Sequence, residues 1–348
     1  MAYTTIKKSS DYFNTVTYTG NTSAGHAITG VGFQPDLTWN KSRANATPHY
    51  LFDVIRGATN FIKSDSTSAE SQNTDTLTSF DSDGFTLGNA TGNNGSGSFA
   101  SWNWKANGAG SANTDGTISS TVSANTTSGF SIVKYTGTGA TGTIGHGLNS
   151  APSCIITKSA SAAEDWGMYH VGIGNTSNIS LNLTNAQYSA NSAFWNNTNP
   201  TSSVFTVGTH PTINYNTQTM IAYCFAEKQG FSKFGSYTGN GSTDGPFVYT
   251  GFKPAFLIVK NVDAGEAWGM HDNKRPGLGN GNAPVGHFEL YPNLSNAENS
   301  AGAAGQIDFL SNGFKLRTAT NSLNVTQNYI YMCFASEPLV GDNPATAR

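Results

Sequence analysis

The sequence repeats one pattern three times, and this repetition limits the possible folds more than any other feature. The tripeptide Tyr-Thr-Gly begins at Tyr18, Tyr135 and Tyr237. A proline follows each tyrosine after 17 positions, and a lysine follows it after 23 positions. These residues are Pro35, Pro152 and Pro254, then Lys41, Lys158 and Lys260. Because chance does not preserve such spacing, the chain is predicted to consist of three copies of one module.

The repeat divides the chain into three copies of about 100 residues, a size typical of small domains. The predicted segments are an arm (1–12), copy one (13–105), a linker (106–128), copy two (129–228), copy three (229–337) and a tail (338–348). The linker is rich in Gly, Ser, Thr and Asn, which is typical of a flexible connection. We therefore expect copies two and three to pack more rigidly than copies one and two.

The local patterns predict an all-β chain. Short runs of β-branched and aromatic residues end in turns, and the turns at Asp83-Gly84 and Asn312-Gly313 are typical of tight hairpins. Helical periodicity is nearly absent, and its best candidate, 185–192, is short and poor in apolar residues. We expect three tandem antiparallel β-sandwich repeats of jelly-roll or lectin-like form.

The composition argues against several classes of partner. Charged residues make up only 11% of the chain, its net charge is −3, and no Lys/Arg cluster is present, so nucleic acid is not expected to bind. No apolar run is long enough to insert into a membrane, and no signal peptide is recognisable. Cys224 and Cys333 occupy the same position in two copies, so buried free thiols are expected rather than a disulfide.

The familiar catalytic and metal-binding motifs are incomplete. The stretch 81–84 resembles the opening of a calcium loop, but the distal carboxylate is missing, so a turn is the better interpretation. The seven histidines lack the spacing of a zinc site. Glu164 and Glu266 could form an acid/base pair for glycoside hydrolysis, but copy one has no equivalent. We therefore expect no cofactor, no metal and no enzymatic activity.

One pair of charged residues recurs. Asp272 and Arg275 repeat the Asp-x-x-Arg of Asp53 and Arg56, whereas copy two differs at both positions. A salt bridge that closes a loop is the favoured interpretation, and contact with a ligand or partner is the alternative.

Copy three also contains an insertion. Ala297 lies 60 positions after its tyrosine, whereas Ala69 and Ala186 lie 51 positions after theirs, so copy three has nine additional residues. We place them in 276–286, beside His287. Because loops on a rigid scaffold often carry function, we expect ligand or partner contacts from Asn280, Asn282 and His287. A solvated insertion without function is the alternative.

The tryptophans fall into two groups. Trp166 and Trp268 occupy the same position, 31 residues after their tyrosines, where copy one has His49, so both are predicted to be buried. Trp195 is less tied to the repeat. We expect it to be exposed and available to stack on a sugar ring.

Several runs resemble a family of uncharacterised repeat proteins encoded by marine tailed bacteriophages. The resemblance covers nearly the whole chain and rests on residues 10–15, 32–36, 77–88, 102–106, 232–241 and 346–348. It implies a virion structural protein, sometimes grouped loosely with concanavalin-like sandwiches. It brings no established catalytic or binding residues.

These observations lead to two hypotheses. The first is a non-enzymatic structural protein of the virion surface, a head decoration or appendage, made in the host cytoplasm. Its partners would be other virion proteins and further copies of itself, for example in a trimer. The alternative is a tail-fibre or receptor-binding protein whose carbohydrate-binding modules recognise a host-surface glycan. A polysaccharide-degrading enzyme ranks third.

Overall fold

The computed structural model describes residues 4–275, 288–299 and 306–338, and the fold is all-β, as predicted. Copy one contains β1 (Phe13–Gly20), β2 (His26–Ile28), β3 (Leu37–Ser42), β4 (Tyr50–Asp53), β5 (Asn60–Phe61), β6 (Ser71–Gln72), β7 (Leu77–Asp81), β8 (Gly84–Leu87) and β9 (Gly97–Trp104). Copy two contains β12 (Phe130–Thr136), β13 (Gly142–Gly145), β14 (Cys154–Ser159), β15 (Gly167–His170), β16 (Ile179–Ser180), β17 (Val204–Val207) and β18 (Thr219–Phe225). Copy three contains β19 (Ser232–Thr238), β20 (Phe247–Tyr249), β21 (Phe252–Asn261), β22 (Gly269–Asp272), β23 (Ile307–Leu310), β24 (Gly313–Leu316) and β25 (Asn328–Pro338).

Helices are short in the described part of the chain. They are the 3₁₀ turn η1 (Ser9–Asp11) and the single turns α1 (Thr91–Asn94) and α2 (Pro211–Asn214). The candidate helix at 185–192 is not helical, which agrees with its lack of an apolar stripe.

The same strand order recurs in all three copies. The antiparallel orders are β1-β9-β3-β4 in copy one, β12-β18-β14-β15 in copy two and β19-β25-β21-β22 in copy three. Each copy also has a smaller sheet: β2-β8-β7, β13-β17 and β20-β24-β23, respectively. The hairpin turns expected at Asp83-Gly84 and Asn312-Gly313 join β7 to β8 and β23 to β24.

The segment predicted to be a linker is partly a strand pair, so that expectation was wrong. Residues 111–113 form β10 (Ser111–Asn113), and residues 120–125 form β11 (Ser120–Asn125). β11 pairs with β12 and extends the sheet of copy two. The backbone of β11 forms hydrogen bonds with the edge of β12, which would otherwise be unpaired. The polar composition of the segment did not indicate this pairing.

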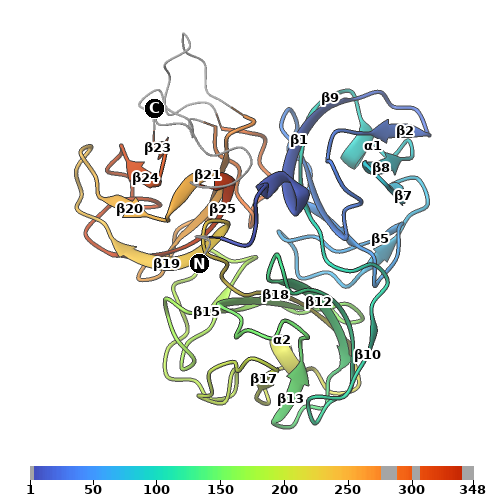
Figure 1. The fold of residues 1–348 in the computed structure, drawn as a ribbon, viewed down its shortest axis with the longest axis vertical. Coiled ribbons are helices and arrows are strands. Elements are labelled where there is room, and N and C mark those ends of the chain that lie inside the picture. Colours follow the sequence, from blue (N-terminus) through green and yellow to red (C-terminus); the bar gives the residue numbers. More distant parts are fainter. Residues whose placement is uncertain (1–3, 276–287, 300–305, 339–348) are drawn as a thin grey trace.

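The three copies surround a shared core, and Figure 1 shows them as three lobes around a common centre. Trp104, Phe225 and Phe334 occupy equivalent places, because each pairs with the first residue of its copy's β1, β12 or β19. Their ring centroids form a triangle with sides of 6.3, 5.9 and 5.8 Å. This triangle marks an approximate threefold axis inside a single chain.

Each large sheet is apolar on both faces. In β18, Ile221 and Tyr223 face the shared core, whereas Ala222 and Cys224 face a separate core of copy two. The alternation follows from the two-residue period of a strand. Copies one and three have separate cores of their own, which include residues of their smaller sheets. The expected buried free thiols are confirmed for Cys154, Cys224 and Cys333.

Candidate functional site

The repeated Asp-x-x-Arg of copy three lies where this copy meets copy one. Asp272 ends β22, and its carboxylate accepts hydrogen bonds from the backbone amides of Lys274 and Arg275, both at 3.0 Å. The Nε atom of Arg275 lies 2.6 Å from the second carboxylate oxygen. Both residues are at most 1% exposed. The predicted salt bridge that closes a loop is therefore present, and the chain itself occupies both groups.

Two residues of copy one complete this network. Trp102 donates its indole N–H to Asp272 at 2.9 Å, and the Arg275 guanidinium lies 5.4 Å from the centre of the Trp102 ring. Glu298 bridges Arg275, at 2.8 Å, and Arg43 of copy one, also at 2.8 Å. Arg43 and Glu298 are 255 positions apart in the sequence. We call this contact between copies three and one the closing joint, because it completes the ring of three copies.

The closing joint keeps Arg275 charged. Burial alone would lower the pKa of Arg275, but the carboxylates of Asp272 and Glu298 raise this pKa above its ordinary value. An arginine buried in this way stabilises the fold only while its carboxylate partners remain in place.

Copies one and two meet through an equivalent network, which we call the first joint. Arg56 contacts Asp53 at 2.6 Å and Glu70 at 3.1 Å. The hydroxyl of Tyr223, from copy two, donates to Asp53 at 2.8 Å. Strand register places Tyr223 at the position that Trp102 occupies in copy one. Each Asp-x-x-Arg thus meets a hydrogen-bond donor from a neighbouring copy.

Copies two and three meet through the second joint, which lacks the charged pair. His170 and Ile173 replace the Asp and Arg, and Met332 of copy three stands where Tyr223 and Trp102 stand in the other copies. The Nδ1 atom of His170 accepts the amide N–H of Gly172 at 3.0 Å, so Nε2 carries the proton and donates to the Tyr331 carbonyl at 3.0 Å. Burial lowers the pKa of His170 to about 4, which keeps the ring neutral.

Two of the three repeated lysines, Lys158 and Lys260, also serve these joints, a role that sequence reasoning missed. Lys41, Lys158 and Lys260 are fully buried, and burial lowers the pKa of each to about 8. Each Nζ donates to the carbonyl of the next residue, at 2.7, 2.9 and 2.6 Å, respectively. Lys158 also donates to Thr67 of copy one, and Lys260 to Thr184 of copy two. Their invariant spacing of 23 was the signal that could have identified them.

The two repeated tryptophans are buried as predicted, with exposures of 0% for Trp166 and 2% for Trp268. Each donates its indole N–H to a backbone carbonyl of the preceding copy, Lys63 at 2.9 Å and Ser180 at 3.2 Å. His49, the equivalent residue of copy one, is also buried and accepts the indole N–H of Trp39 at 2.9 Å.

The expectation that Trp195 is exposed was wrong. Trp195 is 1% exposed and packs in the separate core of copy two, 5.8 Å from the ring of Tyr169. Asn196 and Asn197 follow it with positive φ values of 50° and 51°. A turn of this kind suits Asn, and it folds the chain so that the large indole is buried. The other predicted contacts, Asn280, Asn282, His287 and the insertion 276–286, lie outside the described residues.

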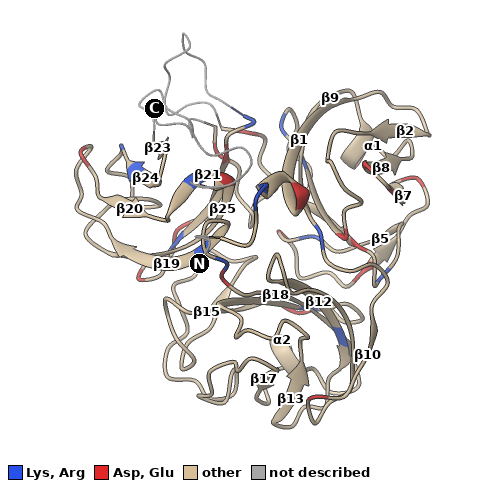
Figure 2. Cartoon of the chain, in the orientation of Figure 1, with Lys and Arg blue, Asp and Glu red and all other residues tan. Residues whose placement is uncertain are grey.

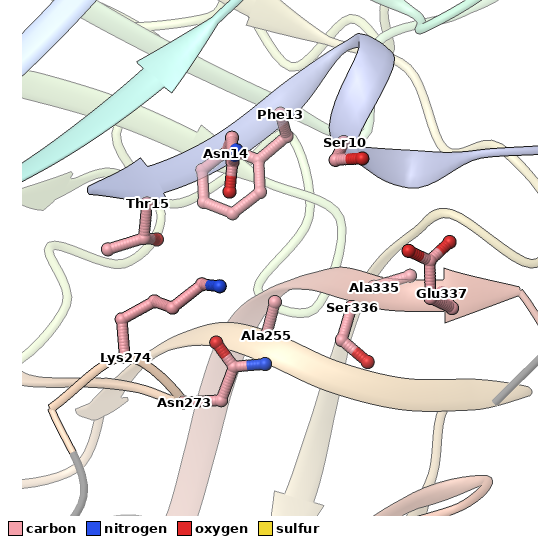
Figure 3. Close-up of a pocket in the computed structure, with 10 residues that line it drawn as sticks. All are labelled: Ser10, Phe13, Asn14, Thr15, Ala255, Asn273, Lys274, Ala335, Ser336 and Glu337. Carbon is pink, nitrogen blue, oxygen red and sulfur yellow. The ribbon is translucent and has the colours of Figure 1, made fainter. Parts of the chain in front are cut away.

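A hollow of about 280 Å³ borders the closing joint. Figure 3 shows side chains from β1 on one side of it and side chains from β21, β25 and the turn after β22 on the other. The Lys274 amine points into the space between them. Asn273, Ser336 and Glu337 add amide, hydroxyl and carboxylate groups, which could hydrogen-bond a small polar molecule.

The first and second joints each have a cleft, and these two clefts occupy positions equivalent to each other. Arg56, Glu70 and Ser161 line the cleft of the first joint, and Ile173, Gln187 and Asp263 line that of the second. At the closing joint, Arg43 takes the place that Ala160 and Val262 have in the other two, 25 positions after the tyrosine. Its long side chain reaches Glu298 and fills the corresponding space.

Charged side chains are sparse outside these joints. Figure 2 shows them as short isolated stretches along the ribbon. Among the described residues, no group of three or more His, Cys, Asp or Glu side chains could hold a metal ion. Nor does any helix in this part of the chain have the length and apolarity needed to span a membrane.

The comparisons with known proteins place the chain in a family. It belongs to a family described as a domain of unknown function (DUF7483), whose sequence profile matches residues 8–338. No curated protein and no solved structure matches the chain. A single match that spans all three copies agrees with the shared core, in which the copies form one body.

Proposed function

We propose that the protein is a non-enzymatic structural component of a virion surface, a head decoration or appendage. In this proposal each copy is an antiparallel β-sandwich, and the three sandwiches form one rigid ring. The resemblance to repeat proteins of marine tailed bacteriophages suggests the virion. The closing joint is the observation that carries the structural role.

The closing joint supports this role because of what its charged groups do. Arg275 and Asp272 are buried, and the Glu298 side chain is only 8% exposed. Arg275 contacts both carboxylates, Glu298 also contacts Arg43, and Asp272 also accepts from Trp102. These groups hold the first and last copies together. Functional sites usually leave some polar groups available to a ligand, whereas this network uses them to fix the shape of the molecule.

The ring of three copies also fits a position on the symmetric surface of a virion. One chain already presents three similar lobes around an approximate threefold axis (Figure 1). A component of this kind can occupy a symmetric position and contact neighbouring virion proteins through its outer faces. Self-association of the chain, for example as a trimer, remains part of the proposal.

The experiment is immunogold labelling of particles, combined with mass spectrometry of particles purified through a density gradient. We expect the antibody to mark virions and the protein to remain with them at a constant ratio to the major capsid protein. A host cytoplasmic protein of similar abundance serves as the control for carry-over. Failure of the antibody to mark particles, with the protein left in the soluble fraction, would contradict the proposal.

A further inference from the structure

Copy three exposes two aromatic rings that the other copies lack. Phe247 and Tyr249 are 44% and 57% exposed, and Val248 between them is 8% exposed. Because alternate side chains of a strand share a face, both rings point outward from β20. β20 is an edge strand of its sheet and lies at the outer side of the copy-three lobe (Figure 1).

The strand register shows that the other two copies fold without rings at these positions. Val248 pairs with Phe314, as Ile28 pairs with Phe85 and Ile144 pairs with Phe205. The positions of Phe247 and Tyr249 therefore correspond to Ala27 and Thr29 in copy one and to Thr143 and Gly145 in copy two. Two large rings placed in water at positions where small residues suffice indicate a contact that is specific to copy three.

Tyr249 also lines a cleft of about 340 Å³. The cleft lies beside the edge strands β19 and β20, and its polar residues include Glu227, Gln229 and Lys233. The Nζ atom of Lys233 lies 2.6 Å from a carboxylate oxygen of Glu227, and these two side chains are 37% and 34% exposed. The cleft thus combines an aromatic wall with hydrogen-bond donors and acceptors that solvent can reach.

The equivalent opening is closed in the other two copies. In copy two, β11 covers the edge of β12, and Ile118 bridges to Ile144. In copy one, the side-chain amide of Asn14 donates to the carbonyls of Gly30 and Val31, at 3.3 and 3.0 Å, and so ties the first strand to the segment after β2. Copy three has Lys233 at the position of Asn14, and this lysine pairs with Glu227 instead.

We propose that this cleft binds a neutral saccharide. The apolar face of a sugar ring can pack on Tyr249, and the sugar hydroxyls can pair with the Glu227 carboxylate, the Lys233 ammonium group and the Gln229 amide. Because the carboxylate and the ammonium group balance each other, the cleft offers no net charge to a phosphate or an acidic polymer. This proposal goes beyond the structural role above and does not depend on it.

The test is binding of the full chain to an array of neutral oligosaccharides built from glucose, galactose, mannose and N-acetylglucosamine. The best binder is then titrated by saturation-transfer NMR. We expect Tyr249→Ala to weaken binding by up to about tenfold, the loss that follows from removing one aromatic contact. Lys233→Met should weaken binding while retaining the fold. Tyr215→Ala, which removes a 36% exposed tyrosine of copy two, is the matched control and should bind like the parent.

Two results would overturn the proposal. One is that the parent binds no neutral saccharide on the array. The other is that Tyr249→Ala leaves saccharide binding intact and instead abolishes self-association in sedimentation, because the aromatic pair would then be a protein contact. Neither result bears on whether the protein is found in virions, so this proposal and the structural role can fail separately.

Discussion

The closing joint and the second joint both hold two neighbouring copies together. The closing joint uses buried charges, whereas the second joint uses a neutral histidine and apolar side chains. At the closing joint, Asp272 and Arg275 are buried against Trp102, whose indole N–H donates to the aspartate. At the second joint, His170 and Ile173 replace the charged pair, and Met332 takes the place of the tryptophan. The charged pair occurs where the neighbouring sheet supplies a donor and is absent where that sheet supplies a thioether. The difference indicates that these charges belong to contacts between copies.

The largest expected effect comes from breaking the charged pair on one side. Asp272→Ala leaves the Arg275 guanidinium buried without its main acceptor and leaves the Trp102 N–H unpaired. We expect the free energy of unfolding to fall by about 3–5 kcal/mol, measured by denaturant titration. The matched control is Asp11→Ala, which removes the exposed pair with Lys8 and should change stability by less than about 1 kcal/mol. Similar losses in the two variants would contradict this account of the closing joint.

The second joint should be sensitive to acid through His170. The pKa of His170 is about 4 in the fold, below its ordinary value of 6.5, so the unfolded chain binds the proton first as the pH falls. The stabilisation is therefore fully present above pH 6.5 and is lost as the pH falls toward 4. From the shift we expect a loss of about 3 kcal/mol.

The measurement is the difference in unfolding free energy between the parent and His170→Gln at pH 7 and at pH 4.5. The glutamine amide can still donate to Tyr331 but does not titrate. His49, His146 and His210, whose pKa values burial also lowers, are common to both proteins and cancel in the difference. Parallel pH profiles for the two proteins would rule out the assignment to His170.

A smaller effect is expected when one hydroxyl of the first joint is removed. Tyr223→Phe keeps the ring but deletes the hydroxyl, which donates to Asp53 at 2.8 Å and accepts from Arg56 at 3.3 Å. Because the acceptor is charged, the expected cost is about 1.5–3 kcal/mol. Met332→Leu at the second joint removes no such bond and should cost less than about 1.5 kcal/mol. Equal costs at the two sites would remove the distinction between polar and apolar joints.

Sequence reasoning was reliable where the copies repeat. The register of Trp166 and Trp268 predicted two buried side chains, because a large ring in the same place twice indicates packing. The turn residues Asp83-Gly84 predicted a hairpin from local φ requirements. These conclusions need only local geometry and periodicity.

It failed where a segment takes its structure from the strand or turn beside it and not from its own composition. β11 is polar, and it is a strand because the edge of β12 lies beside it. Trp195 lacks a repeat partner, so its burial depends on a turn made by the two asparagines that follow. The convergence of Trp104, Phe225 and Phe334 on one axis also could not be predicted, since spacing along a chain does not show how whole copies pack.

The most direct test converts the first joint into the chemistry of the second. Arg56→Ile alone should lower the free energy of unfolding by about 3–5 kcal/mol, because the Asp53 carboxylate is left buried without its cationic partner. The fourfold variant Asp53→His, Arg56→Ile, Glu70→Gln and Tyr223→Met reproduces the second joint. It should recover to within about 2 kcal/mol of the parent, since a packed apolar contact can replace a buried ion pair. A fourfold variant that is as unstable as the single variant would contradict the claim that the charged pair is one of two interchangeable ways to join the copies.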